Sequence, residues 1–198
     1  MAENVVAYDA VVLTGGKASR LGGASKAEIE ILGSPLLVHV LGIASEARTT
    51  VVVGPESAHH PREFTVVEDP QGGGPVAGLA AGMAALERMR VGAPLPWLLV
   101  LACDAPFAGP AVEALEAAAT VATADALVAI DGGRRQPLLA LYRRAALVEA
   151  MAGMNVDGAS MRSLLALLTV MEVEAPPGSA RDLDTWEDVL AAQGGKNG

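Results

Sequence analysis

Uninterrupted apolar runs are the feature that most constrains the fold of this chain. Residues 51–53 are all valine, and residues 98–101 are Leu-Leu-Val-Leu. Such runs are typical of strands that helices cover on both faces, because a half-exposed strand alternates apolar and polar residues. Segments with helical spacing of apolar residues lie between the strand-like runs, which indicates βαβ units. The sequence therefore predicts an α/β fold with a doubly wound, mostly parallel sheet flanked by helices.

The same patterns predict the positions of the elements. Strands are expected at residues 10–14, 49–54, 64–67, 97–102, 126–130 and 138–142, and helices at residues 36–47, 76–89, 109–119 and 160–168. No composition shift divides the 198 residues, so we expect a single domain at residues 9–193. Residues 1–8 are expected to form a flexible N-terminus, and residues 194–198, Gly-Gly-Lys-Asn-Gly, a disordered tail.

Composition and charge exclude several classes of partner. The formal net charge of −9 argues against nucleic acid, whose phosphates require a basic protein face. No apolar run has the length of a membrane span, and the first nine residues lack the features of a secretion signal, so no membrane association is expected. The single cysteine, Cys103, excludes an internal disulfide and fits a reducing compartment. We therefore expect a cytoplasmic protein.

A glycine-rich loop that carries Arg20 and Lys26 follows the first expected strand. Residues 12–26 are Val-Leu-Thr-Gly-Gly-Lys-Ala-Ser-Arg-Leu-Gly-Gly-Ala-Ser-Lys, with Arg20 and Lys26 among four glycines. Glycines let backbone N–H groups approach and surround an anion, and the two cations add positive charge to an acidic protein. The pattern predicts a binding loop for a polyphosphate. The alternative is a glycine-rich turn with solvated basic residues.

Asp104 follows the apolar strand expected at residues 97–102. In open α/β sheets, ligands bind outside the carboxyl ends of the strands, so this carboxylate and the glycine-rich loop are expected at the same edge. Mg²⁺ is usually held by one or two carboxylates together with substrate phosphates and water, and Asp104 suits that role. The alternative is that Asp104 caps the helix beginning near Gly109 or starts a turn.

Several short motifs, in a fixed order, relate the chain to a known family. The glycine-rich loop resembles a pattern that reads roughly L-x-G-G-x-x-x-R-x-G-x-x-K. Further motifs follow it: Leu-Gly-Ser-Pro-Leu at 32–36, Glu-Asp-Pro at 68–70, Gly-Pro-Val-Ala-Gly-Leu at 74–79, Cys-Asp-Ala-Pro at 103–106 and Asp-Thr-Trp-Glu-Asp at 184–188. Together they span about residues 9–192, and the chain resembles the molybdenum cofactor guanylyltransferase family of nucleotidyltransferases. The resemblance implies a Rossmann-like nucleotidyltransferase fold.

The resemblance also implies an activity. Members of this family transfer GMP from GTP to the phosphate of molybdopterin and release pyrophosphate, with Mg²⁺ as cofactor. GTP and molybdopterin are therefore the expected substrates, and transient contacts with molybdoenzyme maturation proteins are expected too. Two alternatives stay open. One is a cytidylyltransferase, or another nucleotidyltransferase with a different phosphorylated acceptor, and the other is a non-catalytic relative that binds nucleotide.

The resemblance assigns roles to particular residues of this chain. The expected catalytic residues are Arg20, Lys26 and Asp104, and the expected metal ligands are Asp104 and Asp184. The residues expected to bind the nucleotide are Leu13, Thr14, Gly15, Gly16, Lys26, Gly54, Asp69, Gly74, Pro75, Gly78 and Asp104. The residues expected to bind the acceptor, whose phosphate suits guanidinium groups, are Arg134, Arg135, Gln136 and Pro137.

Structural alternatives accompany these assignments. Asp184 and Glu187 form a capping box, which we favour as the main role of Asp184, and Asp182 is a further candidate for the metal. For Asp69 the alternative is an Asp-Pro turn that ends a strand. For the segment with the two arginines it is an exposed hairpin or crossover.

The chain departs from the family pattern at three positions. Ser25 stands where most relatives have aspartate, Thr14 where alanine is usual, and Gly54 where asparagine is frequent. A side-chain contact from position 54 is therefore expected to be missing, whereas Thr14 adds a hydroxyl group.

Overall fold

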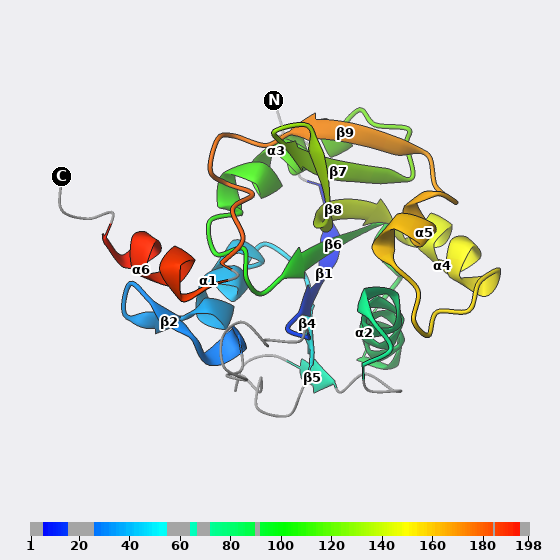
Figure 1. Cartoon of the computed structure of the whole chain (residues 1–198). Helices are drawn as coiled ribbons and strands as arrows, with labels where there is room; N and C mark the ends of the chain where they lie inside the picture. The colour runs from blue at the N-terminus through cyan, green and yellow to red at the C-terminus, as the bar shows by residue number, and fades with distance from the viewer. Residues whose placement is uncertain are drawn as a thin grey trace.

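The computed structural model describes residues 6–15, 26–54, 64–66, 72–89, 92–183 and 185–194. Within these residues, seven strands form one sheet in the order β5-β4-β1-β6-β8-β7-β9 (Figure 1). β8 runs antiparallel to its neighbours β6 and β7, and every other pair is parallel. The expected doubly wound, mostly parallel sheet is confirmed. The strands are β1 (Tyr8–Leu13), β4 (Thr50–Val53), β5 (Phe64–Val66), β6 (Trp97–Ala102), β7 (Ala126–Asp131), β8 (Arg134–Arg143) and β9 (Val170–Glu174).

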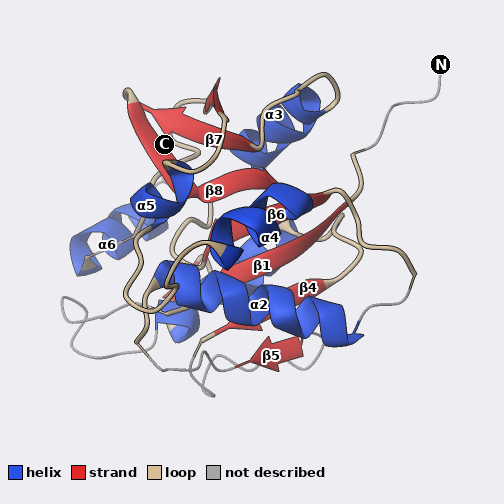
Figure 2. Cartoon of the chain, turned by 90° about the vertical axis from the view of Figure 1, so that its right-hand side faces the viewer, coloured by secondary structure: helices blue, strands red, loops and turns tan. Residues whose placement is uncertain are grey.

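Helices cover both faces of this sheet. On one face lie α1 (Leu36–Ile43) and α3 (Gly109–Ala119), and on the other α2 (Pro75–Met89), α4 (Arg144–Ala152) and α5 (Met161–Leu165). Figure 2 shows the second group in front of the strands. Alternate residues of β1 enter the two cores, Val12 on the first face and Val11 on the second. This two-sided burial is the reason that the central strands are apolar at every position.

α2 lies unusually close to the sheet because of Gly82. A Cβ atom at this position would lie 2.8 Å from Cγ1 of Val11 and 3.1 Å from Cγ2 of Val53. The missing side chain lets the helix backbone approach Val11 of β1 and Val53 of β4 closely.

A smaller layer packs beside α1. It contains the 3₁₀ turn η2 (Lys26–Glu28), the short antiparallel pair β2 (Glu30–Ile31) and β3 (Ser34–Pro35), and the C-terminal helix α6 (Trp186–Gly194). Leu183 and Val189 share its core with Ile31, so the C-terminal helix packs against the β2–β3 pair, which is far from it in the sequence (Figure 1). Among the helices that the structure describes, none combines the length and apolar character needed to cross a membrane.

Some elements differ from the prediction. α4, β9 and the β2–β3 pair were not expected, and β8 begins at Arg134 rather than near Leu138. α4 buries Arg144 and exposes Val148, so apolar residues do not mark its inner face. β9 is a half-exposed edge strand with two glutamates, Glu172 and Glu174, and its apolar signal is correspondingly weak.

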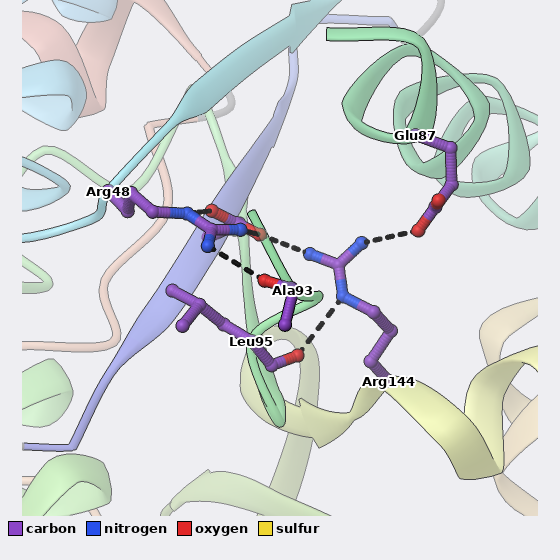
Figure 3. Close-up of polar contacts among 6 residues, drawn as sticks. Arg48, Glu87, Ala93, Leu95 and Arg144 are labelled. Carbon is purple, nitrogen blue, oxygen red and sulfur yellow. Dashed lines mark hydrogen bonds and ion pairs between the residues drawn. The ribbon is translucent and has the colours of Figure 1, made fainter. Parts of the chain in front are cut away.

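A buried carboxylate ties the N-terminal edge of the sheet together. Asp9 in β1 is 2% exposed. Arg48 donates from Nε and Nη2 to its two oxygens at 3.1 and 2.9 Å, and Arg144 Nη2 donates to Oδ2 at 2.5 Å. The same guanidinium groups donate to the carbonyls of Ala93 and Leu95 (Figure 3). One carboxylate thus joins β1 to the loop before β4, the segment before β6 and the start of α4.

Replacing Asp9 by asparagine is expected to lower the free energy of unfolding by about 3–5 kcal/mol, because it removes the buried negative charge that pairs with the buried Arg144. Urea denaturation of the wild type and the variant measures the loss. Glu87→Gln is the control. Glu87 Oε1 lies 3.7 Å from Arg144 Nη1 and the side chain is 49% exposed, so a loss below about 1 kcal/mol is expected. Equal losses in the two variants would contradict the central role of Asp9.

A second polar contact holds the edge strand β9. Asp125 lies directly before β7 and Thr169 directly before β9. Thr169 donates to Asp125 Oδ2 from its hydroxyl at 2.6 Å and from its backbone N–H at 2.9 Å. Because both bonds favour the charged carboxylate, they hold the pKa of Asp125 below its ordinary value.

This depressed pKa predicts a pH-dependent stability. The contribution of Asp125 is present above the ordinary aspartate pKa and is lost as the pH falls through the lower folded value. Asp125→Asn is expected to lower the free energy of unfolding by about 1 kcal/mol at pH 7, since the pair is partly solvated, and by less in acid. Thermal unfolding of both proteins at pH 7 and pH 3 measures this. A difference that does not change with pH would refute the account.

Candidate active site

A cleft of about 230 Å³ opens at the C-terminal edge of the sheet, between the ends of β1 and β6 and the first half of β8. Its lining residues are Leu13, Gly15, Ala102, Cys103, Asp104, Ala105, Gln136, Pro137, Leu138, Leu139, Ala180 and Asp182. Residues expected at the nucleotide and residues expected at the acceptor therefore line one cleft. Leu138 and Ala180 also line the cleft. They could not be assigned to the site from the sequence, because an apolar side chain indicates no particular chemistry.

Asp104 lies at the cleft because the backbone pairing of β6 with β1 extends one residue past the end of β6. Cys103 donates its backbone N–H to the carbonyl of Leu13 at 3.0 Å, one residue beyond the last strand pair. The half-buried Asp104 follows directly. The N-cap of α3 is Ala108, without a side-chain capping bond, so Asp104 does not cap that helix.

The segment before α6 lines the same cleft with Ala180 and Asp182. Leu183 donates its backbone N–H to the carbonyl of Asp104 at 2.9 Å, and its buried side chain fixes the segment in the small core beside α6. The exposed Asp182 next to it lines the cleft. The sequence left Asp182 as a further candidate beside Asp184, and the described residues bring Asp182 to the site.

The two carboxylates fit a magnesium ion. Asp104 and Asp182 come from different segments and face one cleft. Within the part of the chain that the structure describes, no group of three or more His, Cys, Asp or Glu side chains could hold a metal ion. Mg²⁺ needs no such group, since phosphate oxygens and water complete the shell around one or two carboxylates.

A glycine turn leads into the N-terminus of α2 at the same sheet edge. Gly72 and Gly74 have φ of +79° and +89°, and α2 begins at Pro75. Gly158 donates its N–H to the carbonyl of Gly73 at 2.7 Å, so the segment between α4 and α5 supports the turn. The first turn of α2 leaves backbone N–H groups without helical partners, as an anion or a base edge requires.

The segment expected at the acceptor forms the hairpin between β7 and β8. Gly132 and Gly133 have φ of +54° and +76°, as a two-residue type I′ turn requires. Arg134 and Arg135 are exposed, and Arg135 Nε lies 2.6 Å from Oε1 of Glu172 on β9. The two arginines therefore lie in an exposed hairpin, which is the structural alternative that the sequence left open for this segment. Gln136 and Pro137, the next two residues, line the cleft.

Several expected site residues lie outside the described residues. These are Gly16, Arg20, Asp69, Asp184 and the side chain of Lys26.

Comparisons with known proteins identify the family of this chain. The model of the MobA-like NTP transferase domain matches residues 10–173. The molybdenum cofactor guanylyltransferase of Vibrio cholerae is 32% identical over 146 residues, 72% of this chain and 68% of that protein. A probable molybdenum cofactor guanylyltransferase of Bacillus cereus is 30% identical over 199 residues, 94% of this chain and 96% of that protein.

Solved structures share the fold. Molybdopterin-guanine dinucleotide biosynthesis protein A from Archaeoglobus fulgidus superposes with a TM-score of 0.68 at 26% identity, over 93% of this chain and 96% of that one. The 2-C-methyl-D-erythritol 4-phosphate cytidylyltransferase from Thermus thermophilus has a TM-score of 0.66 at 23% identity, over 94% and 97%. The second likeness concerns the fold alone.

Two of the departures from the family pattern are physically linked. Thr14 donates its backbone N–H to the carbonyl of Val53 at 2.8 Å and its hydroxyl to the same carbonyl at 3.1 Å. A Cβ atom at Gly54 would lie 1.7 Å from Thr14 Oγ1. The threonine hydroxyl therefore occupies the space that any side chain at position 54 would need, and Thr14 and Gly54 form one coupled pair.

Gly54→Ala is expected to destabilise the protein by about 1–3 kcal/mol, because the new methyl group overlaps Thr14. Thr14→Ala in the same chain removes the overlapping hydroxyl and is expected to recover most of that loss. A residual cost is expected from the remaining Cβ–Cβ distance of 3.1 Å. Chemical denaturation of both single variants and the double variant measures the coupling. Additive losses in the double variant would contradict it.

Proposed function

Because this chain belongs to the MobA-like NTP transferase family, we propose that it transfers GMP from GTP to the phosphate of molybdopterin and releases pyrophosphate. The observation that carries the proposal is one cleft that is lined by Gly15 and Asp104 together with Gln136 and Pro137. The relatives at 30–32% identity bear the name molybdenum cofactor guanylyltransferase, which supports GTP as donor and molybdopterin as acceptor.

The proposed reaction is an in-line displacement at the α-phosphorus of GTP. A phosphate oxygen of molybdopterin attacks, the new phosphoanhydride bond forms, and the bond to the β-phosphate breaks with release of pyrophosphate. The protein needs no covalent intermediate, since it positions the two phosphates and neutralises developing charge. The proposed roles are triphosphate binding by Arg20 and Lys26, nucleotide contact by Asp69, and acceptor contact by the segment from Arg134 to Pro137.

The proposed cofactor is Mg²⁺, held by Asp104. When bound, the ion neutralises charge on the phosphate oxygens. The second carboxylate is Asp182, which lines the cleft, or Asp184, and the variants Asp182→Asn and Asp184→Asn distinguish the two. We also propose that the protein is cytoplasmic and makes transient contacts with molybdoenzyme maturation proteins. The chain has a single cysteine, the buried Cys103, so it forms no internal disulfide, and this supports a reducing compartment.

Pyrophosphate release by the purified protein tests the function. With molybdopterin and Mg²⁺, we expect release with GTP and far less with CTP, ATP or UTP. Chelation of the metal by EDTA is expected to abolish release. Preference for CTP, or tight GTP binding without turnover, would contradict the proposal and support one of the two alternatives.

The same assay tests the site. Asp104→Asn and Lys26→Ala are each expected to lower the rate about 10²–10³-fold, roughly 3–4 kcal/mol, because each removes a preorganised charge. Asp125→Asn, at the opposite edge of the sheet, is the matched control and is expected to leave the rate unchanged. Rates within about threefold of the wild type for both site variants would refute the assignment.

A further inference from the structure

The wall of the cleft formed by β8 departs from regular pairing. Val128 of β7 pairs with Ala140, but the next residue, Ala129, pairs with Gln136. Three residues of β8 therefore have no Cα partner on β7. On its other side, β8 pairs with β6 as far as Leu139, opposite Leu101. The irregular stretch, residues 137–139, coincides with the part of β8 that lines the cleft.

Pro137 suits this irregular stretch because proline has no N–H for a strand ladder. Its carbonyl, however, needs a donor if it is to be buried. Tyr142, five residues further along the same strand, donates its hydroxyl to the carbonyl of Pro137 at 2.7 Å. The bond links the regular part of β8 to the irregular part and holds the carbonyl of Pro137 against the Tyr142 side chain.

The donor in this bond is held rigidly. Tyr142 is 0% exposed and belongs to the core beneath α2, α4 and α5, with Leu98 and Leu147. Burial raises the pKa of Tyr142, so the hydroxyl keeps its proton and remains a donor across the neutral range. A buried hydroxyl without a partner would be costly, which makes the bond to Pro137 a constraint on both groups.

We propose that Tyr142 is a positioning residue for the acceptor side of the cleft. Its hydroxyl fixes the carbonyl of Pro137 and thereby holds Gln136 and Pro137 against the bound acceptor. The part of this inference that concerns the acceptor rests on the proposed function. The part that concerns the conformation of β8 rests on the geometry alone.

Tyr142→Phe removes the hydroxyl and keeps the packed ring, so the variant is expected to fold. Hydrogen–deuterium exchange of the amides at residues 136 and 138–141 is expected to increase. In the transfer assay, the KM for molybdopterin is expected to rise on the order of tenfold. The KM for GTP and kcat are expected to stay within about twofold, because the nucleotide side of the cleft is built from β1 and β6.

Tyr8→Phe is the matched control. Tyr8 is the other tyrosine of the chain, is 2% exposed, and donates its hydroxyl to Glu116 Oε1 at 2.5 Å, at the start of β1 and away from the cleft. Its loss is expected to lower stability without raising exchange at residues 136–141 or the KM for molybdopterin. This contrast separates a positioning role of Tyr142 from a general loss of stability.

Two results would overturn the inference. One is unchanged exchange at residues 136–141 in Tyr142→Phe. The other is a KM for molybdopterin that changes no more than in Tyr8→Phe. If the wild type transfers nothing to molybdopterin, the proposed function fails, but the exchange comparison still decides whether the hydroxyl of Tyr142 holds the β8 wall.

Discussion

Parallel pairing of β1 with both β4 and β6 is the constraint on which the rest of the structure depends. It requires helices on both faces, so the strands are apolar throughout, and it brings the carboxyl ends of three strands to one edge. Two backbone bonds carry the pairing past the strand ends, from Thr14 to Val53 and from Cys103 to Leu13. Through them, Gly54 and Asp104 lie on either side of the end of β1, although they are far apart in the sequence.

The polar groups at the two edges of the sheet have different roles. At the N-terminal edge, Asp9 binds Arg48 and Arg144, and Arg143 stacks on Trp97 at 4.4 Å while donating to two carbonyls. These groups hold loops together. At the C-terminal edge, the carboxylates of Asp104 and Asp182 line a cleft. Arg134 and Arg143, which begin and end the same strand, therefore serve different ends of the fold.

The sequence patterns predicted the parts of the fold that depend on local signals. Unbroken apolar runs predicted β1, β4 and β6, and helical spacing predicted α2 and α3. The motifs predicted the family and placed Asp104, Gln136 and Pro137 in one site. β9 was missed because its exposed glutamates interrupt the apolar pattern of a strand. α4 was missed because it buries an arginine, so apolar residues do not mark its inner face. The overlap of Thr14 with Gly54, the shifted register of β8 and the bond from Tyr142 could not be predicted, since each depends on which distant strands become neighbours.

The reversed direction of β8 has a consequence for how this site can diverge. β6 leaves the site edge through α3, which is also part of the core. β7 instead leads into β8 at that edge through the two-residue turn of Gly132 and Gly133. An insertion or deletion at that turn changes the strand that brings Gln136 and Pro137 to the cleft, and it leaves β1 and β6, which bring Gly15 and Asp104 to it, unchanged. A scaffold of this kind can exchange its second substrate while keeping its first.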